Sequence, residues 1–293
     1  MLVDNSRENY LFVLRSPCVS IVAMPSHYPE RVVQWASERS IQAIWSRNPG
    51  GRALLFIHGY GGNPVGTWAD FHELLPTEAK AAPCDLIFYD YDGLRADMTA
   101  SAEIFRQFLD SLFGHPAPLI NTSLPVSAAR PVEFGYQEII IIGHSLGAVI
   151  ARLAILQAND AGKAWTANLK LVLFAPAHMG ANVVALALSV ISGLPFLMLA
   201  AGVWRFQSPL IDQLTRDSAE LRTLGEETRK VLAEGKCHCL VAKTVVHAEH
   251  EKIVSNVKFC SDPPAIPFDG DHFSVCKPNL GFPDPLNVVL AIL

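Results

Sequence analysis

Short apolar runs alternate with segments of helical spacing along most of the chain. Runs bounded by turn residues predict β-strands at Val19–Met24, Ala53–Ile57, Leu86–Tyr89, Glu138–Ile142, Leu169–Phe174 and Cys239–Val246. Apolar residues at helical spacing predict helices at Trp68–Ala82, Asp97–Phe113, Leu146–Ala158 and Ser218–Ala233. Several strands are apolar on both faces, which is typical of a parallel sheet covered by helices on both sides. The pattern therefore predicts an α/β fold.

Two segments interrupt this alternation. The stretch His115–Gly135 contains several prolines and predicts an excursion loop. The stretch Met179–Trp204 contains no charged residue. Because no linker divides the chain, we expect residues 1–293 to form a single α/β domain with an apolar cap inserted at about 179–225.

Composition narrows the class of partner. Half of the residues are hydrophobic, 17% are charged and the formal net charge is −5. This balance gives no electrostatic reason to expect a nucleic acid as partner. The six cysteines follow no disulfide-scaffold spacing, and Asp4 and Glu8 stand where a signal peptide would be positive. We therefore expect a cytoplasmic chain with free thiols.

The segment "IIIIGHSLGA" runs an apolar strand into a serine fenced by glycines. A serine hydroxyl is a poor nucleophile unless a base lies within hydrogen-bonding reach. A tight strand-to-helix turn can present the oxygen of Ser145, and glycines at 143 and 147 relieve the crowding of such a turn. The alternative is an ordinary loop serine. The helical pattern that follows favours a nucleophile at Ser145.

A nucleophile that attacks acyl groups also needs N–H donors for the oxyanion. The backbone amide of Leu146, at the start of the next helix, is one candidate. The segment "LLFIHGYGG" supplies a glycine-rich loop after an earlier strand. We assign the second donor to the amide of Tyr60, with Gly61 as the near alternative, and expect Gly61 and His144 to contact substrate. His58 is expected to brace this loop.

Six motifs occur in the order found in one superfamily. They are "HGYGG…TW" at 58–68, "FYDYD" at 88–92, "GHSLGA" at 143–148, "FAPAHMG" at 174–180, "EKIV" at 251–254 and "DHFSVCKP" at 271–278. Together they resemble the α/β-hydrolase superfamily, and in detail its lipase-like serine esterases close to phosphatidylinositol-glycan deacylases and SERAC-type proteins. The resemblance covers roughly 53–278 and implies a mostly parallel sheet with a cap between strands six and seven.

The resemblance also assigns a base and an acid. His272, in the late motif, matches the catalytic histidine of the family, with His178, His247 and His250 as weaker candidates. The family places an aspartate in a loop after the preceding strand, where this chain has Glu251; glutamate is an accepted substitute. Glu249 remains an alternative acid. We interpret Asp269 and Asp271 as structural loop residues.

A metal site is the weaker interpretation of the cysteines and histidines at 237–239 and 247–251. The ligand types suit zinc, but no second ligand pair has a recognised spacing, and a strand would point alternate side chains to opposite faces. We therefore expect neither a metal nor a cofactor.

The uncharged segment is long enough to cross a bilayer. A single crossing would separate Ser145 from His272, and Gly193-Leu194-Pro195 instead predicts two short helices joined by a bend. A buried core helix is the alternative. We favour an apolar lid in which Leu197 and Leu199 contact an acyl chain, with peripheral membrane contact through 179–204.

These features predict a serine hydrolase that cleaves esters of apolar acyl groups, with a small molecule or lipid ester as its substrate. An acyltransferase with the same residues and a catalytically silent, membrane-associated binding module on the same fold are the rival hypotheses.

Overall fold

The computed structural model describes residues 31–33, 41–124, 126–186 and 209–293. Its centre is an eight-stranded sheet with the strand order β1-β2-β4-β3-β5-β6-β7-β8. β2 pairs antiparallel with β1 and β4, and the other neighbouring strands pair parallel. The strands are β1 Arg31–Val33, β2 Gln42–Ile44, β3 Arg52–Ile57, β4 Cys84–Tyr89, β5 Glu138–His144, β6 Leu169–Phe174, β7 Thr244–Ala248 and β8 Ile266–Phe268.

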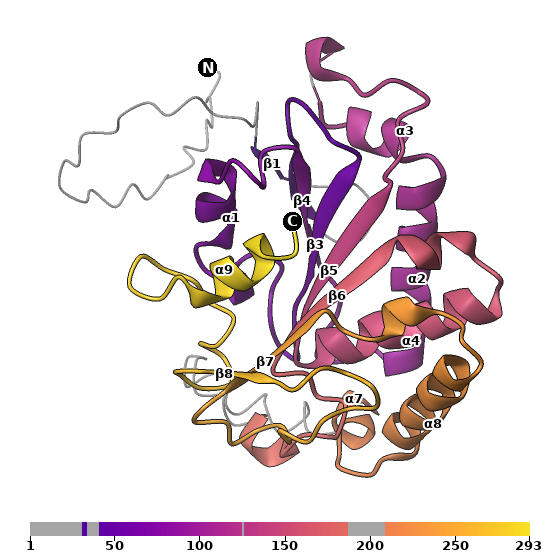
Figure 1. The fold of residues 1–293 in the computed structure, drawn as a ribbon, viewed down its shortest axis with the longest axis vertical. Helices are drawn as coiled ribbons and strands as arrows, with labels where there is room; N and C mark the ends of the chain where they lie inside the picture. Colours follow the sequence, from indigo (N-terminus) through magenta and orange to yellow (C-terminus); the bar gives the residue numbers. More distant parts are fainter. Residues whose placement is uncertain (1–30, 34–40, 125, 187–208) are drawn as a thin grey trace, which may run out of the picture.

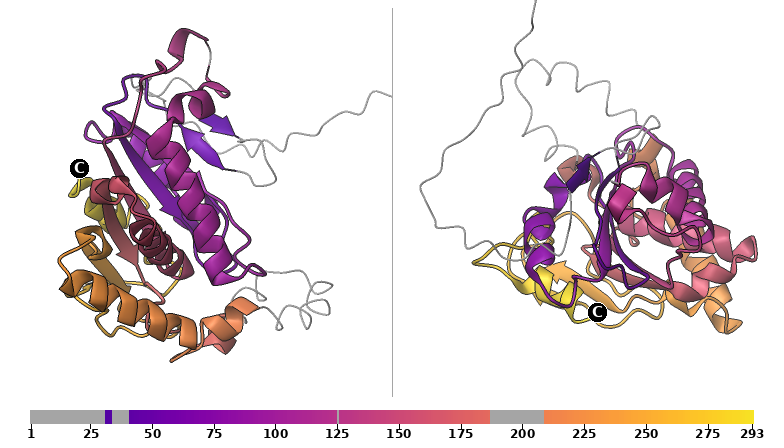
Figure 2. Two further views of the ribbon diagram at one scale, coloured as in Figure 1. Left: turned by 90° about the vertical axis from the view of Figure 1, so that its right-hand side faces the viewer. Right: turned by 90° about the horizontal axis from the view of Figure 1, so that it is seen from above.

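Helices cover both faces of this sheet. α2, α4 and α8 lie on one side, and α1 and α9 lie on the other (Figures 1 and 2). The helices named here are α1 Phe71–Leu74, α2 Met98–Gly114, α3 Pro116–Asn121, α4 Leu146–Asp160, α7 Pro209–Gln213, α8 Ala219–Ala233 and α9 Asp284–Leu290. The α/β fold with a mostly parallel central sheet, expected from the sequence, is therefore confirmed.

The central strands are buried on both faces, as their continuous apolar sequences require. All four isoleucines of β5 are fully buried, and so are the apolar residues of β3 beside it. Burial of this much aliphatic surface contributes about 25 cal/mol per Å² and fixes the register of the sheet. The carboxyl ends of β3, β5, β6 and β7 consequently meet at one edge, where loops from distant parts of the sequence come together.

Most predicted elements occur with shifted bounds. One predicted helix is broken into short pieces, and the first part of one predicted strand is a 3₁₀ turn. The predicted helix Trp68–Ala82 is replaced by three short pieces, two of them 3₁₀ turns at Gly66–Trp68 and Leu75–Thr77. Ala69 has φ = 45°, and Pro76 cannot donate a helical hydrogen bond, so one continuous helix does not form. The predicted strand Cys239–Val246 begins only at Thr244, after a 3₁₀ turn.

Other differences concern the ends of the sheet and its loops. The strands β1, β2 and β8, at the two ends of the sheet order, carry weak sequence signals because each is only three residues long. The stretch His115–Gly135 contains the short helix α3, which begins at a proline in the first helical turn. The predicted strand Val19–Met24 lies outside the described residues.

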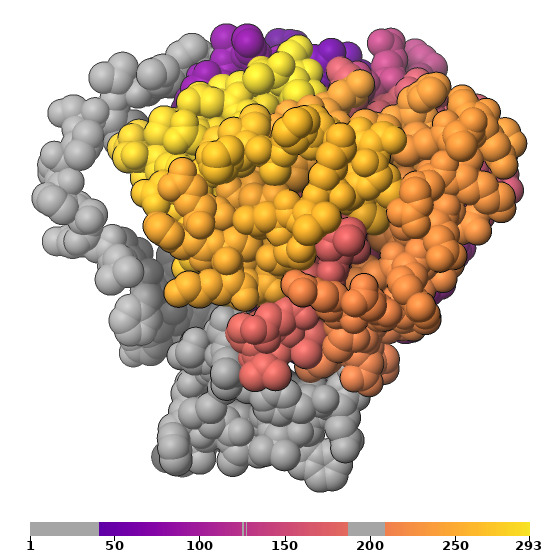
Figure 3. All heavy atoms as spheres, turned by 60° about the horizontal axis from the view of Figure 1, so that its bottom comes forward, coloured from indigo at the N-terminus to yellow at the C-terminus, as the bar shows by residue number. Residues whose placement is uncertain are grey.

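The connection between β6 and β7 is where the cap was expected. Of the predicted cap, residues 179–186 and 209–225 are described, and its expected end at residue 225 falls inside α8. Ser218 caps the start of α8, because its hydroxyl accepts a hydrogen bond from the amide of Leu221, and α8 packs along α4. Figure 3 shows the described residues 209–243 of this connection beside the last part of the chain. Within the described ranges, no helix has both the length and the apolar character needed to span a membrane.

Candidate functional site

Ser145 occupies the turn between β5 and α4. Its backbone has φ = 51° and ψ = −118°, a conformation that costs a residue with a side chain about 1–3 kcal/mol. The turn is held because the Ser145 amide donates to the Phe174 carbonyl at 3.0 Å. A Cβ atom at Gly143 would lie 2.9 Å from Ala148 Cα, and one at Gly147 would overlap the carbonyl oxygens at the end of β3. Glycine is required at both places.

His272 lies against this serine. Its Nε2 is 3.0 Å from Ser145 Oγ, although the two residues are 127 positions apart in the chain. Ser145 is 1% exposed and His272 is 2% exposed. His272 belongs to the loop that follows β8 and comes to the same edge of the sheet as the end of β5. A hydroxyl and a neutral imidazole at this distance can exchange a proton.

Glu251 completes a hydrogen-bonded chain. Its Oε2 lies 3.0 Å from Nδ1 of His272, on the side of the ring opposite the serine. Its Oε1 accepts hydrogen bonds from the amides of Ile253 and Val254 at 2.8 and 3.1 Å. Burial alone would raise the pKa of the Glu251 carboxyl, but the contact with His272 and the two amides hold that pKa below its ordinary value. The carboxylate is therefore ionised at neutral pH.

The other acidic candidates have different roles. Glu249 is exposed, and its backbone amide donates to the Phe268 carbonyl. Asp271 accepts hydrogen bonds from the amides of Phe273 and Ser274, and so shapes the loop of His272. Asp269 is 3.8 Å from His250 at the surface. The structure thus brings Glu251, and not these residues, to the imidazole of His272.

His144 contacts the backbone of the loop that carries His272. Its Nε2 lies 2.8 Å from the backbone carbonyl of His272, so that nitrogen carries the proton and donates it. Burial, reinforced by the positive charge of a protonated His272, lowers the pKa of His144 to about 3. The imidazole is therefore neutral. His144 also lines the cavity described below. Its expected contact with substrate stays a prediction.

The loop after β3 lies beside Ser145. A Cβ atom at Gly59 would stand 2.8 Å from the serine Cβ, so this loop approaches as closely as only glycine allows. The amide of Gly61 donates to the Gly93 carbonyl at 3.3 Å. The assignment of an oxyanion donor to Tyr60 stays a prediction. Leu146 is the first residue of α4, and the first amides of a helix have no intrahelical acceptor.

His58 braces this loop, as the sequence predicted. Its Nδ1 is 2.9 Å from the Gly59 carbonyl, and its Nε2 is 3.1 Å from Asp90. Tyr91 stacks on the imidazole at 4.5 Å and donates its hydroxyl hydrogen to the His58 carbonyl. The motif "FYDYD" therefore supplies the supports of the glycine-rich loop, a role that the sequence did not reveal.

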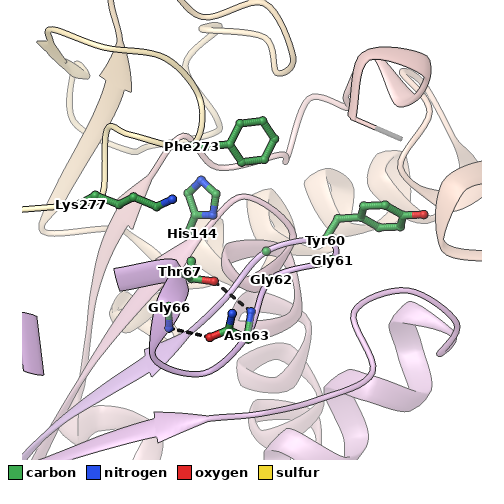
Figure 4. A pocket seen from close by; sticks show the side chains of 10 residues that line it. Tyr60, Gly61, Gly62, Asn63, Gly66, Thr67, His144, Phe273 and Lys277 are labelled. Carbon is green, nitrogen blue, oxygen red and sulfur yellow. Dashed lines mark hydrogen bonds between the residues drawn. The ribbon is translucent and has the colours of Figure 1, made fainter. Parts of the chain in front are cut away.

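A cavity of about 230 Å³ opens between this loop and the loop of His272 (Figure 4). Its wall includes residues 59–63, 66 and 67 on one side, and Phe273 and Lys277 on the other. The two loops touch where the Cys276 thiol lies 3.5 Å from the Thr67 carbonyl. The ring of Tyr60 extends away from His144 in Figure 4. Phe273 and Lys277 stand in the late motif, of which only Asp271 and His272 had been interpreted from the sequence.

A model of the alpha/beta hydrolase family matches residues 54–266 of the sequence. The chain belongs to that family. Among curated proteins, no sequence is similar enough to count as a match. The specific likeness to phosphatidylinositol-glycan deacylases and SERAC-type proteins stays a prediction.

Solved structures share the hydrolase fold at low identity. One is the propeptide form of lipase BlEst2 from Bacillus licheniformis, with 14% identity, a TM-score of 0.53, and coverage of 83% of this chain and 51% of that one. Another is MGS-MChE2, an alpha/beta hydrolase enzyme from the metagenome of lagoon sediments at Mar Chica, Morocco. It has 11% identity, a TM-score of 0.53, and coverage of 89% and 96%. Identities this low show the fold alone.

The remaining candidate residues of this hydrolase lie elsewhere. His178 contacts the Ala148 carbonyl at 3.2 Å, and burial keeps the pKa of its imidazole far below the ordinary value. His247 is buried and His250 is exposed. Leu197 and Leu199, the predicted acyl contacts, lie outside the described residues. In the described part of the chain, no group of three or more side chains is arranged to hold a metal ion.

Proposed function

We propose that this hydrolase cleaves carboxylic esters through an acyl-enzyme on Ser145. The observation that carries the proposal is the hydrogen-bonded chain from Ser145 Oγ through the His272 imidazole to the Glu251 carboxylate, at 3.0 Å for each contact. It forms at a strained turn that presents the serine hydroxyl, and such an arrangement is the working unit of a catalytic triad. Family membership supports hydrolysis as the reaction class.

In the first half-reaction, His272 Nε2 takes the proton of Ser145 Oγ while the oxygen attacks the ester carbonyl carbon. The carbonyl oxygen becomes an oxyanion held by the amides of Leu146 and Tyr60. Glu251 keeps the His272 proton on Nδ1 and stabilises the imidazolium that forms. Collapse of the intermediate breaks the bond to the leaving alcohol, which receives the proton from His272 Nε2, and Ser145 remains acylated.

In the second half-reaction, water takes the place of the alcohol. His272 Nε2 removes a proton from water, the resulting hydroxide attacks the acyl carbon, and a second tetrahedral intermediate uses the same amide donors. Its collapse releases the carboxylic acid and returns the proton to Ser145 Oγ. No step requires a metal or an organic cofactor.

The preference for apolar acyl groups is a further part of the proposal and depends on the sequence of 179–204. Each buried methylene contributes about 0.8 kcal/mol, so kcat/KM should rise with acyl length until the site is full. Leu197→Asp or Leu199→Asp should flatten that rise and weaken binding to liposomes, because a carboxylate resists burial. If folded variants keep the wild-type dependence of kcat/KM on acyl length and the wild-type liposome binding, the segment 179–204 does not act as a lid over an acyl site.

The test of the reaction is hydrolysis of p-nitrophenyl esters by the wild type, Ser145→Ala and the exposed control Ser111→Ala. We expect Ser145→Ala to lose on the order of 10⁴-fold or more in kcat and Ser111→Ala to match the wild type. Product analysis with competing alcohols separates hydrolysis from acyl transfer. A silent binding module would show no turnover that depends on Ser145.

A further inference from the structure

Lys277 differs from the other lysines of the described chain in its surroundings. It is partly buried on the wall of the cavity, and no carboxylate of the described residues lies within 4.0 Å of its ammonium group. Lys163, Lys170, Lys230 and Lys236 each have an acidic partner. Lys80, Lys243, Lys252 and Lys258 have none, but they are exposed to water.

The cavity offers this cation no internal counter-charge. Among the ten described residues on its wall, none is acidic, and the neutral polar side chains are those of Tyr60, Asn63, Thr67 and His144. Asn63 and Thr67 already bond within their own turn, because Asn63 Oδ1 accepts from the Gly66 amide and Thr67 Oγ1 accepts from the Asn63 amide. An ammonium group on the wall of a cavity, with no carboxylate of the described residues within 4.0 Å, can pair with an anionic ligand through a charge-assisted hydrogen bond.

The place of Lys277 relates it to the reacting serine. Figure 4 shows its ammonium end directed toward His144, whose neighbour in the chain is Ser145. The charge of Lys277 contributes to the lowered pKa of His144, after burial and the stronger effect of His272, which agrees with this proximity. Gly59, on the opposite wall, approaches Ser145 as closely as its missing side chain allows. Gly59 and His144 both line the cavity and both adjoin Ser145, so the cavity lies beside the serine.

From this geometry we propose that the cavity at Lys277 is an anion subsite, which selects esters that carry a carboxylate or phosphate group beside the scissile bond. Lys277 holds the anionic group, and Phe273 packs against the apolar atoms that connect it to the ester. This inference rests on the proposed function, since it names a substrate class for the same serine. Lys277 takes no part in proton transfer and is therefore a specificity residue.

The test compares matched esters on the wild type and three variants. The acyl pair is p-nitrophenyl hemiglutarate and p-nitrophenyl valerate, which have equal acyl length with and without a carboxylate. The alcohol-side set is phenyl butyrate, 4-butyryloxybenzoate and 4-butyryloxyphenyl phosphate. These two sets distinguish the side of the ester that enters the cavity, and the last two esters distinguish carboxylate from phosphate. The readout is the ratio of kcat/KM for the anionic ester to that for its neutral partner.

We expect Lys277→Gln to lower this ratio by about tenfold in at least one set, consistent with a partly screened ion pair. Lys277→Arg should retain most of the ratio because it keeps the charge. The matched control Lys243→Gln removes the same charge at the opposite end of the parallel sheet, before β7, and should keep the wild-type ratio. The wild-type ratio should fall as salt is added.

Two results would overturn the proposal. If Lys277→Gln lowers the rates of neutral and anionic esters equally, with a shifted pH profile, the lysine acts on His272 and not on the substrate. If the ratios are the same in all four proteins, no anion subsite exists, and Ser145-dependent hydrolysis of neutral esters would leave the esterase itself intact. Absence of any Ser145-dependent turnover would contradict both proposals. Circular dichroism of each variant confirms its fold.

Discussion

Nδ1 of His272 and Oε2 of Glu251 lie 3.0 Å apart, although glutamate stands where the family has aspartate. The longer side chain fits because its other oxygen is anchored by the amides of Ile253 and Val254. One oxygen of the carboxylate thus bonds to its own loop, and the other contacts the imidazole. Glutamate at this position is compatible with the same orienting role.

The first prediction tests that role. Glu251→Gln should lower kcat by on the order of 10²- to 10⁴-fold, because an amide cannot stabilise the imidazolium and can favour the wrong tautomer of His272. Glu249→Gln is the matched control, two residues away with its side chain exposed, and should keep near-wild-type activity. Steady-state kinetics on one ester measure both. A larger loss at Glu249 would move the acid to that position.

Strain at Ser145 leads to a prediction about stability. Glycine adopts φ = 51° and ψ = −118° without the cost paid by a residue with a Cβ atom. Ser145→Gly should therefore have a free energy of unfolding about 1 kcal/mol higher than that of Ser145→Ala, and both should be inactive. Urea denaturation measures the difference. Equal or lower stability of the glycine variant would show that the turn stores no strain.

The buried neutral imidazole of His144 predicts how stability depends on pH. Its pKa is about 3 in the folded protein and about 6.5 in an unfolded chain, so below pH 6.5 the unfolded state binds a proton that the folded state does not. This group's contribution is fully present above pH 6.5 and is lost as the pH falls toward 3.

His144→Gln removes this titration while keeping an N–H donor for the His272 carbonyl. The decrease in unfolding free energy between pH 7 and pH 5 should be smaller in the variant by about 1–2 kcal/mol. Denaturation curves at the two pH values test this. The variant should still lose some stability between pH 7 and pH 5, because burial also lowers the pKa of His178. An unchanged decrease in the variant would contradict a neutral, buried His144.

The sequence predicted the features that depend on local pattern or motif. The four isoleucines before Gly143 predicted the central strand, and the glycines around Ser145 predicted the turn, because each reflects a steric requirement of a few adjacent residues. His272 and Glu251 came from the resemblance to a family. Their contact depends on two loops that only the order of parallel strands brings together.

Other features could not be predicted because their signals are spread over distant residues. Lys277 and Phe273 become wall residues only when the loop after β8 folds against the loop after β3. The strands β1, β2 and β8 are too short for their alternation to stand out. The prediction of one helix at Trp68–Ala82 was wrong because the apolar residues that gave its period are buried without a common helix. Trp68, Phe71 and Leu75 lie in three separate short pieces, and Ala81 lies in the turn after them.

The most direct test of the account is covalent labelling with a fluorophosphonate, followed by peptide mapping. The probe reacts with an activated serine, and the serine oxygen displaces its fluoride. We predict one modified residue, Ser145, with labelling abolished in Ser145→Ala and strongly slowed in His272→Ala, while Ser111→Ala labels as the wild type does. Labelling at another serine, or a rate unaffected by His272→Ala, would contradict the claim that His272 activates Ser145.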